Sequence, residues 1–363
     1  MAAIAAVAWF LIHNTLANMQ ARGIKSGFDF LTQAAGFDIG ESLYPFDSGE
    51  SYLQAFLVGV TNTLRVAVVG IILATLLGTM LGVGRFSRNA LVRGLCLCYV
   101  EFFRNIPVLL QLLLWYVVLT EVLPATDSAW TVGPFFLSKG GLNFPIPVWG
   151  TGQLWAAYGL LPGVLLGWFY RRWAVAKFEA TGKPGSMVIM PLVIVLLASL
   201  AGWALGGAPT EFNRPIKGDF AIENGGALTP EFLAVLMGLT LYTASFIAEV
   251  IRGGISSVAR GQGEAASALG LNRTQEMRLV MLPQALRVII PPLTNQYLNL
   301  TKNSSLAVAI GYPDVVSIAN TALNQTGRAV ECISIVMLVY LSTSLGTALL
   351  MNWYNSRSAI KER

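Results

Sequence analysis

Long apolar segments constrain the fold of this chain more than any other feature. Residues 66–83 form a run of eighteen whose only polar members are Thr75 and Thr79. A helix of about 20 apolar residues crosses the hydrocarbon of a bilayer, and it satisfies its own backbone hydrogen bonds there. Seven further segments are similar, at residues 2–12, 96–122, 148–169, 187–205, 232–251, 288–310 and 333–353. We therefore predict an all-α integral membrane protein with about eight spans.

The composition agrees with this class. Of the 363 residues, 55% are hydrophobic and 12% are charged, whereas about a quarter of the residues of a soluble domain are charged. His13 is the single histidine, and Cys96, Cys98 and Cys332 lack the spacing of a metal site or a disulfide framework. We expect neither an enzyme nor a nucleic-acid-binding protein. The net charge of +5 is instead interpreted from the side of the membrane on which the basic residues lie.

The first apolar segment is short, although Leu16 and Ala17 extend it. No basic segment precedes it and no clear A-x-A cleavage site follows it, so we expect a spanning helix rather than a cleaved signal peptide. Residues 18–52 then form a polar connector. In the second span, Gly78 and Gly82 have the spacing that allows close helix approach. In the third, Pro107 predicts a kink.

Basic residues are divided unevenly between the two sides of the predicted bundle. Sixteen of the 24 Lys and Arg residues lie in loops on one side: Arg85, Arg88, Arg93, Arg104, Arg171, Arg172, Lys177, Lys183, Arg252, Arg260, Arg273, Arg278, Arg287, Arg357, Lys361 and Arg363. Six lie on the other side: Arg22, Lys25, Lys139, Arg214, Lys217 and Arg328. Because Lys and Arg collect on the cytoplasmic side, the loop after the sixth span, residues 253–284, is predicted to be cytoplasmic.

That loop is too polar for lipid but has the pattern of an ordered segment. Residues 264–269 are rich in Ala and Leu and predict a short helix. Gly270 can adopt the left-handed conformation with which many helices end. Asn272 can cap a second helix, with Gln275 at the capping-box position. We interpret the loop as a surface that docks against a partner in the aqueous phase.

The loop contains Glu-Ala-Ala, then three residues and a Gly, then nine residues, an aliphatic residue, one residue and Leu-Pro. These positions are Glu264, Ala265, Ala266, Gly270, Val280, Leu282 and Pro283. The pattern resembles the EAA loop of permease subunits of bacterial ABC importers, which usually has Ile where this chain has Val280. The resemblance implies that this loop, with Gly263 and Leu269, couples the permease to a separate ATPase. The alternative is an ordinary ordered loop between two helices.

The chain carries no Walker A sequence. The nearest approach to GxxxxGK[ST], Thr181-Gly182-Lys183-Pro184, lacks the earlier Gly and the following Ser or Thr. We therefore expect no cofactor in this chain, with ATP and Mg bound by the partner ATPase.

The seventh span carries a polar stripe. Pro291-Pro292 is predicted to interrupt its helix near the inner end. Polar residues then recur at intervals of three and four, so they share a helix face: Asn295, Gln296, Asn299, Lys302 and Asn303, followed by Ser304 and Ser305. The stripe suits a zwitterionic solute, because amides donate and accept and Lys302 attracts a carboxylate. The alternative is amide contacts between packed helices.

Two further charged residues lie near span ends. Arg65 is a candidate for the substrate pathway, although snorkelling to the headgroups is the favoured interpretation. Glu249 is expected to pair with Arg252, one helical turn away, rather than to act in catalysis.

A second resemblance narrows the class. Residues 102–111, FFRNIPVLLQ, are similar to the FFR-x-x-P-x-L-x-Q segment of polar amino acid permeases, and residues 302–306, KNSSL, resemble a second segment of that group. The resemblance implies a type I importer fold of five core helices, a second permease subunit, a cytoplasmic ABC ATPase dimer and a periplasmic amino-acid-binding protein. The extra helices resemble the glutamate/glutamine/aspartate/asparagine or general L-amino acid permeases. Asn303 in place of Asp favours acidic and neutral substrates.

The predicted organisation follows from these segments. It comprises a first span with a periplasmic connector (1–54), core helices 1 and 2 (55–123), an insertion with two spans (124–229), core helices 3–5 (230–353) and a cytoplasmic tail (354–363). We expect a multi-pass protein of the bacterial inner membrane. The alternatives are an ion-coupled secondary amino acid transporter, for which we see no clear internal repeat or intramembrane carboxylate, and a membrane scaffold without a transport role.

Overall fold

A computed structural model describes residues 2–21, 26–181, 186, 189–208, 210–218 and 222–358. The chain forms two compact units, Met1–Leu123 with Thr229–Arg363, and Pro124–Leu228. Several residues named in the sequence analysis lie outside the described residues: Arg22, Lys25, Gly182, Lys183, Pro184, Lys361, Arg363 and the first two residues of the fifth predicted span.

The first unit consists of helices. In chain order they are α1 (Ala2–Ala21), the 3-10 turn η1 (Asp29–Thr32), α2 (Tyr52–Gly84), α3 (Ala90–Asn105), α4 (Val108–Val117), the π-helical turn η2 (Val118–Val122), α7 (Pro230–Ser256), α8 (Arg260–Ala268), α9 (Arg273–Gln275), the π-helical turn η4 (Glu276–Met281), α10 (Leu282–Asn303), the 3-10 helix η5 (Ser304–Ile310), α11 (Val315–Thr326) and α12 (Ala329–Ser358).

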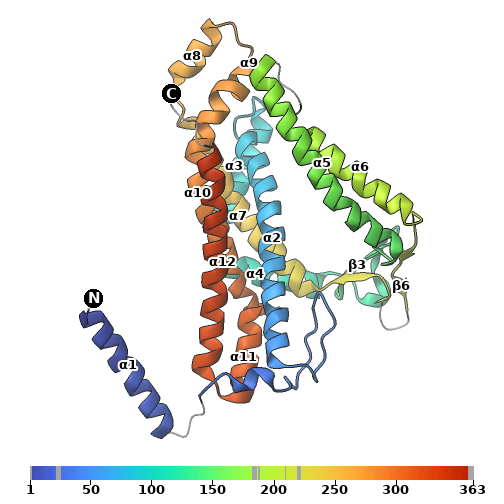
Figure 1. The fold of residues 1–363 in the computed structure, drawn as a ribbon, viewed down its shortest axis with the longest axis vertical. Coiled ribbons are helices and arrows are strands. Elements are labelled where there is room, and N and C mark those ends of the chain that lie inside the picture. The colour runs from blue at the N-terminus through green and yellow to red at the C-terminus, as the bar shows by residue number, and fades with distance from the viewer. Residues whose placement is uncertain are drawn as a thin grey trace. The chain divides into compact units, whose positions relative to one another are not determined.

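Helices α2 and α7 form the centre of this unit. An added Cβ at Gly78 would lie 2.7 Å from Cβ of Ile247, and one at Gly82 would lie 2.8 Å from the carbonyl oxygen of Ala248. The close approach predicted from the Gly78 and Gly82 spacing is therefore confirmed. Helix α10 packs on both, and α12 packs on α10; Figure 1 shows these four helices side by side.

Three described helices are long and apolar enough to cross a membrane: α2, α7 and α12. Two bent pairs meet the same criteria, α3 with α4 and η2, and the segment ending in η5 with α11. These five correspond to the predicted core. Helices also form at the other three predicted spans, but α1 and the 31-residue α5 (Thr151–Thr181) do not meet the criteria and α6 (Ile189–Leu205) has 17 residues.

The third predicted span is sharply bent. Helices α3 and α4 meet at an angle of 103° around Ile106 and Pro107, so the predicted kink is confirmed and is larger than one proline requires. The seventh span shows the opposite outcome. The prediction that Pro291-Pro292 interrupts it is wrong, since α10 continues through both. Each proline removes only one backbone donor, and its fixed φ is helical; packing on α7, α2 and α12 maintains the helix.

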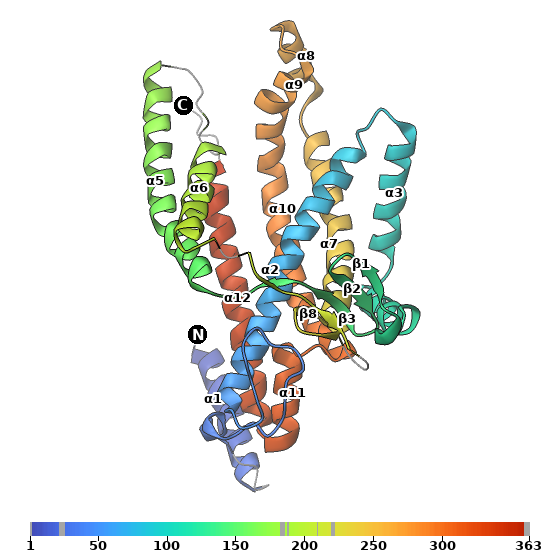
Figure 2. The same cartoon turned by 90° about the vertical axis from the view of Figure 1, so that its right-hand side faces the viewer.

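The two ends of the first unit are built differently. Figure 2 shows α8 and α9 beyond one end of α10, with α11 at the other end. Helix α11 was not predicted. Beside it the connector is ordered: Phe30 is buried in a cluster with residues of α2, α11 and α12. Arg328 donates to the carbonyl oxygen of Gly27, 2.9 Å away, and to Asp29 Oδ2, 3.0 Å away, so ion pairing fixes the connector to the start of α12.

The second unit contains strands that the sequence analysis did not predict. Four form an antiparallel sheet in the order β1 (Trp130–Val132), β2 (Phe135–Ser138), β3 (Gly141–Phe144) and β8 (Gly226–Leu228). Two pairs are β4 (Ile146–Pro147) with β5 (Phe212–Asn213), and β6 (Ile216–Lys217) with β7 (Ile222–Glu223). Helices α5 and α6 pack closely, because an added Cβ at Gly202 would lie 2.2 Å from the carbonyl oxygen of Trp155.

Candidate functional site

The loop between α7 and α10 has the geometry of a rigid protrusion. Helix α8 ends in a turn in which Leu271 N–H donates to the carbonyl oxygen of Ala266 (3.1 Å) and Gly270 N–H donates to that of Ser267 (3.0 Å). This pair of hydrogen bonds is the Schellman motif. Gly270 has φ +74°, a value that glycine adopts without steric cost. The helix end predicted at Gly270 is confirmed.

The second half of the protrusion is also capped as predicted. Asn272 Oδ1 accepts from the Gln275 N–H (2.9 Å), and Gln275 Oε1 accepts from the Asn272 N–H (3.0 Å). This reciprocal pair is a capping box. From α9 the backbone continues as η4 and then as α10, which begins at Leu282 with Pro283 in its first turn.

Helix α8 is fixed on one face and free on the other. Ala266 is buried, an added Cβ at Gly263 would lie 2.8 Å from Glu276 Oε1, and Gln284 Nε2 donates to Gln262 Oε1 (3.1 Å). On the other face Glu264 and Ala265 are exposed. Leu269, at the tip, is 81% exposed. Leu269 is therefore an exposed apolar side chain at the end of a helix whose other face is held in place. This arrangement suits insertion into a groove of another protein.

The polar stripe of α10 divides into two sets. Asn295, Asn299 and Lys302 are exposed on one face, while Gln296 and Asn303 are half-buried. The serines bond to their own backbone: Ser304 Oγ donates to the carbonyl oxygen of Thr301 (2.7 Å) and Ser305 Oγ to that of Lys302 (2.8 Å). The structure thus brings three of the predicted pathway residues together on an open face, and it gives the serines a local role in η5.

Arg65, the remaining pathway candidate, has partners within its own unit. Its Nη1 lies 2.6 Å from Glu41 Oε1, and its guanidinium carbon lies 4.0 Å from the centre of the Phe232 ring. Glu41 Oε2 also accepts from the Thr229 hydroxyl. Burial of Glu41 raises the pKa of its carboxyl, although the bonds from Thr229 and Arg65 oppose that shift. Arg65 therefore ties α2 to the connector.

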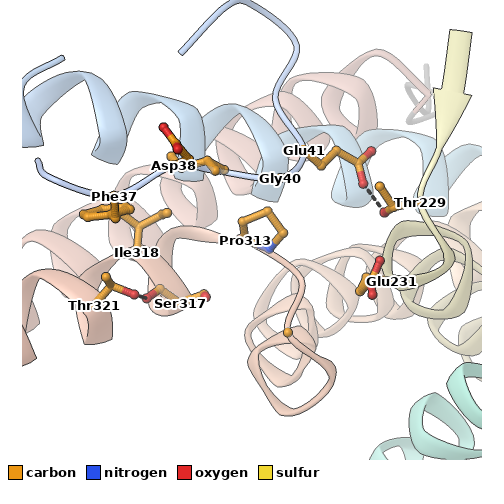
Figure 3. Close-up of a pocket in the computed structure, with 12 residues that line it drawn as sticks. Phe37, Asp38, Gly40, Glu41, Thr229, Glu231, Pro313, Ser317, Ile318 and Thr321 are labelled. Carbon is orange, nitrogen blue, oxygen red and sulfur yellow. Dashed lines mark hydrogen bonds between the residues drawn. The ribbon is translucent and has the colours of Figure 1, made fainter. Parts of the chain in front are cut away.

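A pocket of about 420 Å³ adjoins this group. Figure 3 shows it between the connector, the start of α7 and the segment leading into α11, with Glu41 and Glu231 on its wall. Asp38 also lines it, and Ser317 and Thr321 add hydroxyls. The three carboxylates favour a positively charged group. The sequence analysis missed this pocket, because its walls come from segments far apart in the chain.

An ionic cluster lies at the other end of the bundle. Arg252 Nε donates to Glu249 Oε1 (3.0 Å), so the predicted pair is confirmed. Arg85, the residue directly after α2, also donates, to Glu249 Oε2. The sequence could not indicate this second partner, which lies 164 positions away. Among the described residues, no group of three or more His, Cys, Asp or Glu residues is arranged to hold a metal ion.

Comparison with known proteins agrees with this architecture. Residues 70–358 match the family described as binding-protein-dependent transport system inner membrane component. The chain is 47% identical to the general L-amino acid transport system permease protein AapQ of Rhizobium johnstonii, covering 98% of this chain and 89% of the relative. It is 45% identical to the putative amino-acid ABC transporter permease protein YhdX of Escherichia coli K12, covering 100% and 93%.

A third relative and a solved structure extend the comparison. The glutamate/glutamine/aspartate/asparagine transport system permease protein BztB of Rhodobacter capsulatus is 40% identical over 99% of this chain and 92% of its own length. A crystal structure of an amino acid ABC transporter with histidines has 19% identity and a TM-score of 0.50, covering 84% of this chain and 95% of its own. The fold is therefore that of an ABC importer permease. The chain belongs to the family of binding-protein-dependent transport system inner membrane components, as a permease subunit of the amino acid ABC transporter group.

Proposed function

We propose that this permease imports polar L-amino acids across the bacterial inner membrane and is driven by a separate cytoplasmic ATPase dimer that docks on α8. The observation that carries the proposal is the geometry of the protrusion. Helix α8 ends in a Schellman turn, the following α9 begins with a capping box, and Leu269 is exposed at the tip between them. The protrusion also exposes Met277 and Leu279, and a group of exposed apolar side chains favours burial against a partner.

The docking surface consists of Glu264, Ala265, Leu269 and Gly270, while Gly263 and Ala266 hold α8 on η4. Leu282 and Pro283 begin α10, which follows α8, α9 and η4 in the chain. A displacement of α8 would therefore be transmitted to the transmembrane helix through this short segment. ATP and Mg would be bound by the ATPase, since this chain has no Walker A sequence.

The exposed face of α10 is the proposed lining of the pathway. Lys302 would attract the carboxylate of an amino acid, and Asn295 and Asn299 would bond to its polar groups. A second permease subunit, a homologous and different chain, would cover this face from the other side. A periplasmic amino-acid-binding protein would deliver the substrate.

The names of the relatives support the substrate class. The name of one relative includes general L-amino acids, and the name of another includes glutamate, glutamine, aspartate and asparagine. Asn303 in place of an aspartate removes an anion that would favour cationic substrates. We propose acidic and neutral polar amino acids as the principal substrates.

A substitution at the tip of α8 tests the coupling. Leu269→Asp places a charge where an apolar contact is proposed, and we expect loss of the copurifying ATPase and of ATP-dependent uptake. Leu43→Asp is the matched control, because Leu43 is 59% exposed and lies in the connector, outside the predicted spans. Undiminished copurification and uptake in Leu269→Asp would contradict the docking surface. Uptake that survives ATP depletion but stops when ion gradients collapse would instead indicate a secondary transporter.

A further inference from the structure

A basic pocket lies at the end of the bundle where α7 leads into α8. Its volume is about 460 Å³, and its walls include Arg85, Arg93 and Arg252. It is formed by the two residues that follow α2, by the first half of α3 and by Arg252 near the end of α7. It is separate from the protrusion and from the stripe of α10, and the proposed function gives it no role.

The charges in this pocket are not balanced. Glu249 pairs with both Arg85 and Arg252, so one carboxylate serves two guanidinium groups. Arg93 contacts the carbonyl oxygen of Ser87 through a long bond of 3.4 Å. Among the described contacts, three positive charges therefore face one negative charge. Helix α3 adds to this potential, because it begins at Ala90 in the pocket wall and a helix N-terminus carries a partial positive charge.

Apolar surface adjoins the basic wall. Phe86 and Leu97 line the pocket itself. Along α3, Leu91 is 70% exposed and Leu95 is 63% exposed. A ligand with an anionic head and an apolar tail would contact both the basic wall and the exposed leucines. A water-soluble anion would leave the leucines uncovered. Basic pockets between transmembrane helices at the cytoplasmic side bind the headgroups of anionic lipids.

We propose that this pocket binds an anionic phospholipid. Its phosphate contacts Arg93 and the outward faces of Arg85 and Arg252, and an acyl chain lies along Leu91 and Leu95 of α3. The phosphate chemistry is shared with free inorganic phosphate, and the apolar surface favours the lipid. Bound there, the lipid would link α2, α3 and α7 directly before the chain enters α8.

Arg93 is the residue to change, because it is exposed and outside the Glu249 pairs. The purified transporter complex would be titrated with phosphatidylglycerol, with phosphatidylcholine as the neutral lipid, and bound lipid would be counted by native mass spectrometry. Since one Lys or Arg near an anionic headgroup contributes about a fivefold change in affinity, Arg93→Gln should weaken phosphatidylglycerol binding about fivefold. Arg93→Lys should retain most of it.

Arg88→Gln is the matched control, because Arg88 lies in the loop directly before α3 with an exposed side chain but is not in the pocket wall. Equal phosphatidylglycerol binding by the Arg93→Gln and Arg88→Gln variants would overturn the proposal. Displacement of the lipid by millimolar inorganic phosphate, with phosphate binding equally sensitive to Arg93→Gln, would overturn it in favour of a free-anion site. Loss of the ATPase from Arg93→Gln with unchanged lipid binding would assign the pocket to a protein contact instead.

Discussion

Gln111 donates a hydrogen bond from Nε2 to the backbone carbonyl oxygen of Phe103, 2.9 Å away across the bend between α3 and α4. In an unbroken helix this carbonyl would accept from residue 107, but that residue is a proline and has no N–H. The same Nε2 also donates to the carbonyl oxygen of Ile106 (2.9 Å). One side chain, 2% exposed, therefore satisfies two carbonyls that the bend leaves without helical partners.

Gln111→Leu should destabilise the fold. The side chain keeps its approximate size but loses both donors, and a buried group left unsatisfied costs about 1–3 kcal/mol. The substitution also removes Gln111 Oε1, which is buried without a partner. We therefore expect the free energy of unfolding to fall by about 1–3 kcal/mol, measured by thermal or denaturant unfolding in detergent. Gln33→Leu is the control, since Gln33 is exposed in the connector. Equal loss of stability in both variants would show that the bend does not depend on Gln111.

Gly78→Ala should also destabilise the bundle. The added Cβ would lie 2.7 Å from Cβ of Ile247 and 2.8 Å from the carbonyl oxygen of Ala244, so α2 and α7 would have to separate. Overpacking of this kind costs about 1–3 kcal/mol. Gly346→Ala in α12 provides the contrast, because an added Cβ there has nothing within 4 Å, and helix propensity predicts a gain of up to about 1 kcal/mol. Melting temperatures of the two variants should move in opposite directions.

The features that the sequence predicted well are local. Gly270 and the Asn272/Gln275 pair indicated the turn and the cap of the protrusion, since both depend on residues within one or two helical turns. Gly78 and Gly82 indicated a close contact, because small residues four apart create a groove on a helix whatever helix fills it.

The features that the sequence did not reveal depend on distant contacts. The bond from Arg85 to Glu249 and the pocket beside Glu41 join segments far apart in the chain. The continuity of α10 through Pro291 and Pro292 depends on neighbouring helices rather than on local preference. Helix α11 was missed because its 12 residues are too few for a span, and only packing against the connector and α12 shows its role.

Gly270→Asp should uncouple transport from ATP hydrolysis and weaken ATPase attachment. An added Cβ at Gly270 meets nothing within 4 Å, so the new side chain projects away from this subunit toward the proposed partner. Uptake should fall about tenfold, equivalent to about 1.4 kcal/mol. Gly270→Asn is the matched control, because asparagine has the same shape, tolerates the left-handed conformation and carries no charge. Full copurification of the ATPase with undiminished uptake in Gly270→Asp would contradict the coupling surface.

Lys302→Leu and Asn299→Leu test the pathway. Both side chains are exposed in this subunit, so their removal leaves its core unchanged and assembly should be normal. We expect the Michaelis constant for acidic amino acids to rise most in Lys302→Leu, since that variant loses the cation that would attract a carboxylate. Uptake by reconstituted vesicles measures this. Unchanged uptake in both variants would remove α10 from the pathway and favour helix packing as the role of the stripe.

Glu41 should give the protein a measurable pH dependence. Its folded pKa is raised above the ordinary value of 4.5, chiefly by burial, so the folded state holds its proton at pH values where the unfolded chain has released it. The contribution of this group to stability is therefore greatest below about pH 4.5 and declines as the pH rises through the folded pKa. Glu41→Gln cannot titrate, so acidification from neutral pH toward 4.5 should raise the unfolding free energy of the wild type relative to this variant. Melting temperatures of the two proteins across this range measure the difference. A difference that stays constant with pH would contradict the raised pKa, and one of opposite sign would show that the bond to Arg65 outweighs burial.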